Sequence, residues 1–161
     1  MNNEESEKKY IVAEYMNRNV TTIPKEATLK EAVKKMIDGK TNGLVIIDND
    51  RKVVGILSSG DIARCIVPDY LEGEDQHLAA FESADVFAAR VKEMADTPIT
   101  ACMTRKVHVI KANETLIEAT VILSEYGIRQ LPVVDDNGIL IGYMNRTDIK
   151  QAIAEVLGVD K

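Results

Sequence analysis

Two short turns combine residue types that suit binding of a nucleotide. The first runs from Gly55 to Asp61 as Gly-Ile-Leu-Ser-Ser-Gly-Asp, and the second runs from Gly142 to Asp148 as Gly-Tyr-Met-Asn-Arg-Thr-Asp. In each turn a hydroxyl or amide side chain comes three residues before an aspartate, where a helix is expected to start. The N–H groups and partial positive charge of a helix N-terminus favour a phosphate, and a nearby carboxylate can accept hydrogen bonds from ribose hydroxyls.

The same spacing also has a purely structural explanation. A Ser or Asn before the helix, with an acid in its first turn, stabilises that helix by about 1 kcal/mol without any ligand. Ser58 with Asp61, and Asn145 with Asp148, could therefore act as helix caps alone. The residue spacing alone does not decide between nucleotide binding and helix capping.

The chain contains one sequence unit twice. Residues 16–66 align with residues 103–153 without a gap, at a shift of 87, and fourteen of the 51 aligned pairs are identical. Segments of average composition would match at roughly 6–7% of positions by chance. Two copies of one supersecondary unit usually pack as one body, because neither copy buries its apolar face alone. A pair of lobes also predicts a cleft between them as the functional site.

Each repeat predicts the order strand, helix, strand, strand, helix. The first strands are expected at 20–23 and 107–110, and capping boxes at 28–31 and 115–118 start the next helices. Apolar spacing predicts the buried face of the first of these helices as Leu29, Ala32, Val33, Met36 and Ile37. Gly39 and Gly127 are expected to end the two helices in a left-handed turn. Two apolar runs and a last helix follow in each repeat, and the second of these helices is expected to end at Gly158.

An acidic segment lies between the repeats. It contains both phenylalanines of the chain, Phe81 and Phe87, and residues 84–94 have the spacing of an amphipathic helix. Large aromatic side chains gain most when they are buried. We therefore expect this helix to dock on the repeats and to bury its phenylalanines.

Composition favours a cytoplasmic protein. The 161 residues carry a formal net charge of −6 and are 45% hydrophobic, whereas nucleic acid and anionic membranes favour a basic surface. No apolar run approaches the roughly 20 residues of a membrane span, and residues 1–9 contain no signal-peptide core. Cys65 and Cys102 have no neighbouring histidine, so two reduced thiols and no metal site are expected.

Together the repeated pieces resemble the CBS domain pair, often called a Bateman module, over nearly all of 12–157. The resemblance rests on Tyr-Met-Asn-Arg-Asn-Val at 15–20, Cys-Met-Thr-Arg-Lys-Val at 102–107, Ile-Arg-Gln-Leu-Pro-Val-Val-Asp at 128–135, the Thr-Leu-x-Glu-Ala helix starts and the two turns. It implies an α/β fold of two β-α-β-β-α repeats packed as a pseudo-twofold pair. The parts expected are a disordered tail (1–9), CBS repeat 1 (10–67), an acidic helical insertion (68–98) and CBS repeat 2 (99–158).

The resemblance implies an adenosine-containing regulatory ligand and no required cofactor or metal. AMP, ADP or ATP is expected first, with S-adenosylmethionine or cyclic di-AMP as alternatives. Residues 100–104 are expected to face the Asp61 site, and residues 14–17 the Asp148 site. The aspartates would hold ribose, and Ser58 and Thr147 would contact phosphate. The implied ligand-binding set is Met16, Ser58, Asp61, Thr100, Met103, Thr104, Arg129, Asn145, Thr147 and Asp148. Because Asn145 replaces the usual Ser or Thr, the Asp61 site is expected to matter more.

The leading hypothesis is a stand-alone regulatory sensor that signals to a separate effector protein. The sequence contains no nucleophile–base pair, metal cluster, Walker loop or dinucleotide fingerprint, so no catalytic residue is predicted. One alternative is a ligand-independent scaffold for oligomerisation, and a weaker one is an enzyme. Ile117 and Val121 replace Lys30 and Lys34 of the first repeat, and this apolar stripe predicts a homodimer.

Overall fold

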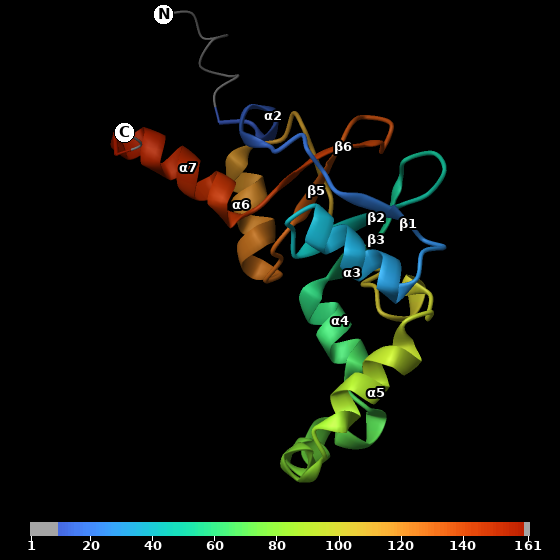
Figure 1. Cartoon of the computed structure of the whole chain (residues 1–161). Coiled ribbons are helices and arrows are strands. Elements are labelled where there is room, and N and C mark those ends of the chain that lie inside the picture. The colour runs from blue at the N-terminus through green and yellow to red at the C-terminus, as the bar shows by residue number, and fades with distance from the viewer. Residues whose placement is uncertain (1–9, 160–161) are drawn as a thin grey trace, which may run out of the picture. The chain divides into compact units, whose positions relative to one another are not determined.

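The computed structural model describes residues 10–159, and the tail expected over 1–9 lies outside them. Both repeats have the expected β-α-β-β-α order, which confirms the mixed α/β class (Figure 1). Helix α2 (Val12–Tyr15) precedes the first repeat, which comprises β1 (Thr22–Pro24), α3 (Leu29–Asp38), β2 (Gly43–Ile47), β3 (Val53–Ser58) and α4 (Ser59–Ile66). The second repeat comprises β4 (Ile110–Lys111), α6 (Leu116–Glu125), β5 (Leu131–Val134), β6 (Leu140–Met144) and α7 (Arg146–Leu157). Between α4 and β4 lie η1 (Asp69–Leu71), η2 (Gly73–Phe81), α5 (Asp85–Met94) and η3 (Ile99–Ala101).

The described chain divides into two compact units that exchange segments. The first-repeat unit comprises residues 21–48 and 54–106, and the second-repeat unit comprises residues 10–20, 49–53 and 107–159. Each unit therefore contains most of one repeat together with the segment that precedes the other repeat in the sequence.

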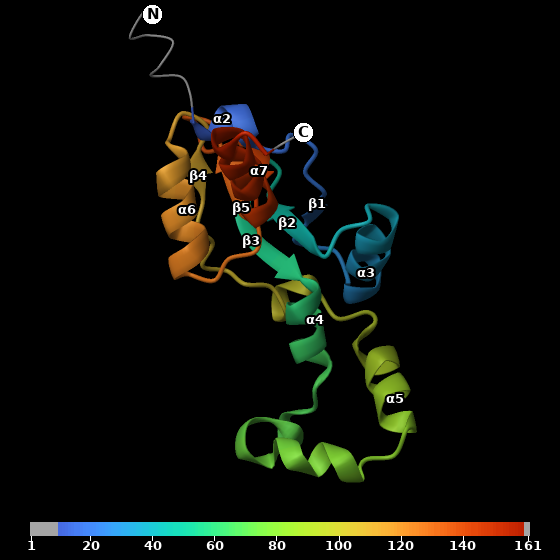
Figure 2. The same ribbon diagram turned by 90° about the vertical axis from the view of Figure 1, so that its left-hand side faces the viewer.

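Each unit contains a three-stranded sheet, in the order β1-β2-β3 or β4-β5-β6. The first two strands of each sheet are parallel, with Ile23 opposite Ile46 and Ile110 opposite Val133. Parallel neighbours need a crossover connection, and α3 and α6 supply it. The last strand of each sheet leads directly into a helix, as Figure 2 shows for β3 and α4. The last strand of each sheet therefore positions one of the two candidate turns.

Both cores contain most of the residues predicted to face inward. Leu29, Ala32 and Met36 of α3 are buried, as are Leu116, Ala119 and Leu123 of α6. The predicted stripe on α3 is too wide, because Val33 is 38% exposed and Ile37 is 70% exposed. Only the i, i+3, i+7 line of α3 contacts the core, so the two flanking residues stay in solvent.

Turns of the first repeat use basic residues where the second repeat uses glycine. Lys40 (φ 49°) and Arg51 (φ 60°) align, at the shift of 87, with Gly127 (φ 60°) and Gly138 (φ 78°). The prediction that Gly39 ends α3 in a left-handed turn is wrong, because its φ is −82°. A Cβ at Gly39 would lie 3.1 Å from neighbouring oxygen atoms, so close packing explains this glycine.

The insertion docks through one end of α5, and its phenylalanines are not buried. Arg90 Nε donates to the carbonyl of Ile66 at 3.1 Å, and Met94 packs against the core of the first-repeat unit. Phe81 is 84% exposed and Phe87 is 69% exposed. The expected burial of both rings is therefore wrong: Phe81 lies in η2, which has no buried residue, and Phe87 lies in the N-terminal half of α5, ahead of Arg90 and Met94.

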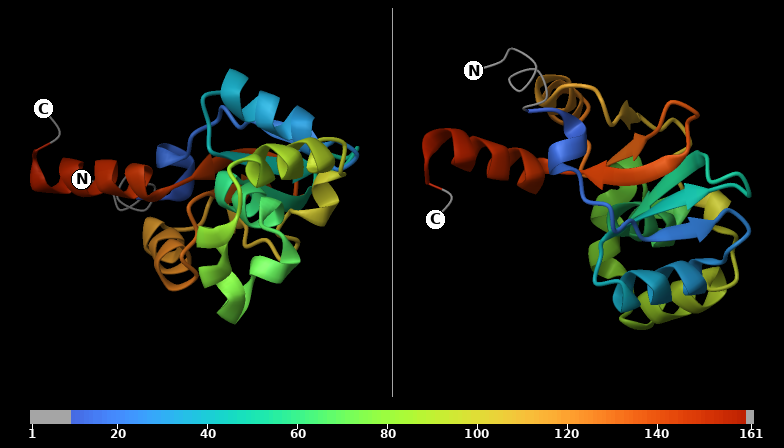
Figure 3. Two further views of the ribbon diagram at one scale, coloured as in Figure 1. Left: turned by 60° about the horizontal axis from the view of Figure 1, so that its bottom comes forward. Right: turned by 90° about the horizontal axis from the view of Figure 1, so that it is seen from above.

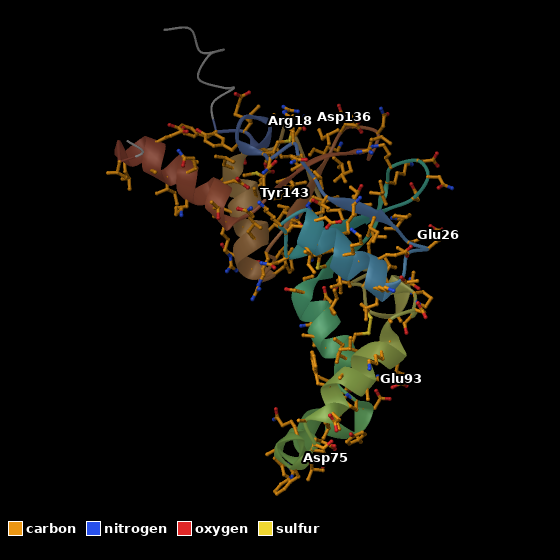
Figure 4. The ribbon with its side chains drawn as sticks, in the orientation of Figure 1. Arg18, Glu26, Asp75, Glu93, Asp136 and Tyr143 are labelled. Atoms are coloured by element: carbon orange, nitrogen blue, oxygen red, sulfur yellow. A yellow bond between two sulfur atoms is a disulfide. The ribbon has the colours of Figure 1, made fainter. Side chains whose placement is uncertain are left out.

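Cys65 and Cys102 form a disulfide within the first-repeat unit, so the expectation of two reduced thiols is wrong (yellow bond in Figure 4). Their Cα atoms lie 5.6 Å apart, within the range that a disulfide spans. Cys65 lies in α4, and Cys102 directly follows η3. Comparing each cysteine only with its own repeat misses this pair, because the segment around Cys102 packs on the other repeat.

Candidate functional site

The turn of the first-repeat unit is a closed, hydrogen-bonded cap. Ser58 Oγ accepts from the N–H of Asp61 at 3.1 Å. Asp61 Oδ2 accepts from the N–H and the hydroxyl of Ser58, both at 2.7 Å. Asp61 is 7% exposed and is the one buried charged residue among residues 10–159. The capping explanation therefore accounts for one oxygen of this carboxylate.

Arg64 contacts the other carboxylate oxygen of Asp61, and sequence reasoning missed this residue. A buried carboxylate needs such a partner, because an unpaired buried charge is costly. The Arg64 side chain is 75% exposed, and an exposed guanidinium near a helix N-terminus is well suited to bind a phosphate. A basic residue one turn after the aspartate was the available signal, and the second repeat has Gln151 at that position.

A segment that precedes the second repeat lies along the strand that ends at Ser58. Thr104 and Ile56 exchange backbone hydrogen bonds of 2.8 and 3.0 Å, as an isolated antiparallel bridge. Thr100 lies in η3, and its carbonyl accepts from Arg105 at 3.0 Å. Residues 100–104 therefore share a unit with the Asp61 turn, as the resemblance implies.

Glycine allows this segment to come so close to the strand. A Cβ at Gly55 would lie 2.7 Å from Met103 Sδ and 3.3 Å from the carbonyl oxygen of Thr104. At Gly142 in the second-repeat unit, a Cβ would lie 2.8 Å from the carbonyl oxygen of Asn17 and 2.9 Å from Met16 Sδ. The glycine before each turn therefore accommodates a methionine-containing segment from the other repeat.

The turn of the second-repeat unit has the same plan with an amide cap. Asn145 Oδ1 accepts from the N–H of Thr147 at 2.7 Å and from the N–H of Asp148 at 3.2 Å. Asp148 Oδ2 accepts from the N–H of Asn145 at 2.8 Å. Asn17 and Tyr143 form the antiparallel bridge that corresponds to the Thr104–Ile56 bridge.

Burial dominates the electrostatic surroundings of Asp148. Burial raises the pKa of Asp148, and the hydrogen bond from the Asn145 backbone partly opposes that rise. Burial, followed by the charge of Asp148, raises the pKa of Tyr143. Tyr143, labelled in Figure 4, accepts from the Asn17 side chain at 3.1 Å. Asp148 therefore keeps a proton to higher pH than an ordinary aspartate does.

The predicted ligand-binding residues fall into two groups, one in each unit. The first-repeat unit contains Ser58, Asp61, Thr100, Met103 and Thr104, and the second-repeat unit contains Met16, Arg129, Asn145, Thr147 and Asp148. Arg129 and Thr147 are exposed, whereas Met16 is buried. Each group draws on both repeats, because Met16 and residues 100–104 come from the exchanged segments.

Four other features of residues 10–159 concern groups outside the two turns. His108 stacks on Tyr126 with ring centroids 4.0 Å apart. Among residues 10–159 there is no group of His, Cys, Asp and Glu side chains that could hold a metal ion. No helix in the same range has the length and apolar character to cross a membrane. A surface hollow of about 380 Å³ lies between η1 and α5, lined by residues that include Tyr70 and Arg90 and by no residue of either turn.

The chain is similar in sequence to other proteins. A family model described as CBS domain matches residues 12–68 and 91–155. An uncharacterised protein of Methanocaldococcus jannaschii is 31% identical, over 78% of this chain and 80% of its own length. A homoserine O-acetyltransferase of Methanococcus vannielii is 24% identical over 89% of this chain, but the match spans 25% of that protein.

Solved structures match the fold over most of the chain. A structure of CBSX2 in complex with AMP has a TM-score of 0.69 at 23% identity, covering 92% of this chain and 98% of that one. The CBS domain pair of protein MJ0100, in complex with 5′-methylthioadenosine and S-adenosyl-L-methionine, has a TM-score of 0.66 at 25% identity. That match covers 94% of this chain and 98% of the MJ0100 chain.

Proposed function

Because the chain belongs to the CBS domain family, we propose that it is a regulatory sensor that binds an adenosine-containing nucleotide and signals to a separate effector protein. Its parts are CBS repeats at 10–67 and 99–158, with a helical insertion at 68–98. One observation carries the proposal: each unit combines a capped aspartate turn with a closely packed segment from the other repeat. The ligands of the MJ0100 domain pair, both adenosine derivatives, support this ligand class.

In the first-repeat unit, Asp61 would accept hydrogen bonds from the ribose hydroxyls. The phosphate would accept hydrogen bonds from the Ser58 hydroxyl and from the N–H groups at the start of α4. Thr100, Met103 and Thr104 would form the wall for the base. To free its outer oxygen, Asp61 must release Arg64, and the phosphate offers that guanidinium a new anion. The exchange keeps both charges paired.

In the second-repeat unit, Asp148 would hold ribose and Thr147 would contact phosphate, with Asn145 as the cap. Met16 would pack against the base, and the exposed Arg129 would add positive charge. Because Asp148 has Gln151 in place of the arginine, this site would bind a phosphate more weakly than the first. AMP, ADP and ATP are therefore proposed for the Asp61 site.

The proposed role is non-catalytic and cytoplasmic, and the proposed assembly is a homodimer. Ile117 is 69% exposed and Val121 is 48% exposed, so the apolar stripe on α6 is available for a second copy. Disulfides of cytosolic proteins are commonly transient or redox-sensing, so the Cys65–Cys102 bond is compatible with this location.

A ligand-independent scaffold is the second candidate, and one observation favours it. Both oxygens of the Asp61 carboxylate already have partners from the chain itself, Ser58 and Arg64. The turn is therefore stable without a ligand. In this alternative the repeats would present the exposed α6 stripe to a partner, whatever the nucleotide concentration.

Binding of a nucleotide distinguishes the two candidates. Melting temperatures are measured for the wild-type protein with AMP, ADP, ATP, S-adenosylmethionine and cyclic di-AMP, and small molecules that co-purify are identified by mass spectrometry. A ligand at a hundredfold excess over Kd should stabilise the fold by about 2.7 kcal/mol. If no adenosine compound raises the melting temperature and none co-purifies, the sensor proposal fails and the scaffold leads.

A further inference from the structure

The disulfide joins the two segments that carry the predicted ligand residues of the first-repeat unit. Cys65 lies one helical turn after Asp61 in α4, and Cys102 lies between Thr100 and Met103. One covalent bond therefore fixes the capped turn against the segment expected to wall the base. The Ile56–Thr104 bridge makes the same connection through hydrogen bonds alone.

The second-repeat unit makes the equivalent contact without a disulfide. At the shift of 87, Cys65 aligns with Ala152 and Cys102 aligns with Tyr15. Ala152 is buried in the core, Tyr15 packs against that core, and the Tyr15 hydroxyl donates to Glu155 at 2.7 Å. Figure 3 shows α2, in blue, beside α7, in red. The fold of a unit therefore does not require a covalent bond at this place.

Both sulfur-bearing residues are accessible. Cys65 and Cys102 are partly exposed residues, unlike the fully buried Leu57 and Ile99 of the same unit, and Cys102 packs against the edge of the core. We expect a dithiol to reach the bond from this partly exposed side. Disulfides that react readily in thiol exchange are those that solvent can reach.

We propose that the Cys65–Cys102 bond is a reversible redox site, and that its state sets the affinity of the Asp61 site for its nucleotide. The inference rests on the proposed function for its ligand. The co-reactant is a dithiol reductant. One of its thiolates attacks a cystine sulfur, the sulfur–sulfur bond breaks, and a mixed disulfide forms. The second thiol of the reductant then displaces the protein sulfur. Two electrons pass to the protein, the two cysteines take up two protons as thiols, and the reductant leaves as a disulfide.

Reduction weakens binding because it removes the covalent link between α4 and residues 100–104, the two segments that form the site. Nucleotide binding must then order α4 and residues 100–104 against each other, and that conformational entropy counts against affinity. The expected coupling is about tenfold in the Kd for AMP. Coupling is reciprocal, so bound AMP should make the disulfide about tenfold harder to reduce.

The test uses AMP as the probe and Asp148→Ala protein, so that only the Asp61 site reports. Calorimetry is done on the oxidised protein and after treatment with dithiothreitol, with thiol titration to count the opened bonds. The matched control carries Cys65→Ala and Cys102→Tyr in addition, which copies the pair of the second-repeat unit. AMP affinity should fall about tenfold on reduction of the parent and should not change in the control. Equal affinity in both redox states, or a bond that dithiothreitol does not open, would overturn the proposal.

A ligand-free measurement separates this inference from the proposed function. Hydrogen exchange of the reduced protein without nucleotide should accelerate at 59–66 and 100–104 and stay unchanged at 146–157. If exchange is the same in both redox states, the redox inference is wrong even if AMP binds. If exchange accelerates but AMP binds in neither state, the nucleotide proposal is the part that fails.

Discussion

Arg64 reaches back one turn of α4 to the buried carboxylate of Asp61, and the second repeat replaces it with glutamine. The Arg64→Gln variant therefore makes the first turn resemble the second. If Arg64 moves to the phosphate on binding, the variant should lose about fivefold in AMP affinity, close to 1 kcal/mol for an exposed charge pair. Its affinity for adenosine should rise, because adenosine breaks the Arg64–Asp61 pair of the wild type and offers the guanidinium no phosphate in return.

Calorimetry with AMP and adenosine, at low and high salt, checks this role. The loss for AMP should shrink as salt rises, because salt screens exposed charges. A variant that loses AMP and adenosine equally would show that Arg64 serves only to hold Asp61 in place.

Asp61→Ala should abolish most of the thermal stabilisation by AMP, and Asp148→Ala should remove less of it. Glu31→Ala is the matched control, because Thr28 and Glu31 form the same kind of capping box at the start of α3, which is not one of the two candidate turns. Each of the three variants loses the carboxylate of a capping box, so all three should be less stable than the wild type. Only loss of the AMP-dependent shift identifies a ligand contact. If Glu31→Ala abolishes the shift as fully as Asp61→Ala does, the carboxylate acts through stability alone.

The stability that Asp148 contributes should decline as pH rises. Burial raises the pKa of Asp148 from 3.8, so the folded state binds this proton more tightly than the unfolded chain does. The contribution is fully present below about pH 3.8 and is lost as pH rises through the folded pKa. Asp148→Asn cannot ionise, so its melting temperature should rise relative to that of the wild type as pH increases across this window.

The stability that Glu118 contributes, in the same unit, should change with pH in the opposite direction. A hydrogen bond from the Thr115 backbone lowers the pKa of Glu118 from 4.5, so its stabilisation is present above pH 4.5 and is lost as pH falls through the lowered value. Glu118→Gln should melt below the wild type at neutral pH and converge with it in acid. Calorimetric melting from pH 3 to 7 measures both variants, and an Asp148→Asn advantage that shrinks as pH rises would contradict the assignment.

Lys40→Gly and Arg51→Gly should each stabilise the protein. Both residues have positive φ, a conformation that costs a non-glycine residue roughly 1–2 kcal/mol. Glycine avoids this cost, but it loses more conformational entropy on folding, which offsets about half of the gain. A net gain near 0.5–1 kcal/mol would raise the melting temperature by about 1–4 °C. The reverse changes, Gly127→Lys and Gly138→Arg, should lower it, and the same sign for both sets would rule out backbone strain as the cause.

Ile117→Lys with Val121→Lys should convert a dimer into a folded monomer. Both side chains are exposed on α6, and charges there would oppose burial against a second copy. Ile37→Lys is the control, because Ile37 is 70% exposed on α3, outside the stripe. Light scattering at low micromolar concentration measures the assembly. A double variant that stays dimeric, or a monomeric wild type, removes this stripe as a dimer contact.

Local signals predicted the elements well. The Thr28 and Thr115 capping boxes start α3 and α6 as expected, and Gly158 (φ 67°) ends α7 as expected. Such signals work because the cap and the left-handed turn involve neighbours in the sequence. The exposure of Ile37 depends instead on how α3 meets its sheet, which residue spacing does not specify.

The parts of the site that depend on the exchanged segments were harder to predict. The family resemblance predicted that residues 100–104 lie near Asp61. The residue types in this segment do not by themselves indicate which strand it pairs with. The disulfide follows from the same exchange, because Cys102 meets α4 of the other repeat. Phe81 and Phe87 misled for a different reason: an aromatic side chain indicates that burial would be favourable, and nothing in its spacing says what would cover it.

The exchange of segments also determines which fragments of this chain can fold. Residues 10–67 lack Ile99 and Met103, which belong to the core of the first-repeat unit. Residues 99–159 lack Val12 and Met16, which belong to the core of the second-repeat unit. Each half expressed alone would expose part of an unfinished core, whereas each half supplies core residues that the other lacks, and Met94 of the insertion adds to the core of the first-repeat unit. Cleavage within the insertion should therefore yield fragments that fold by mutual complementation, and neither duplicated half could be lost without unfolding the other.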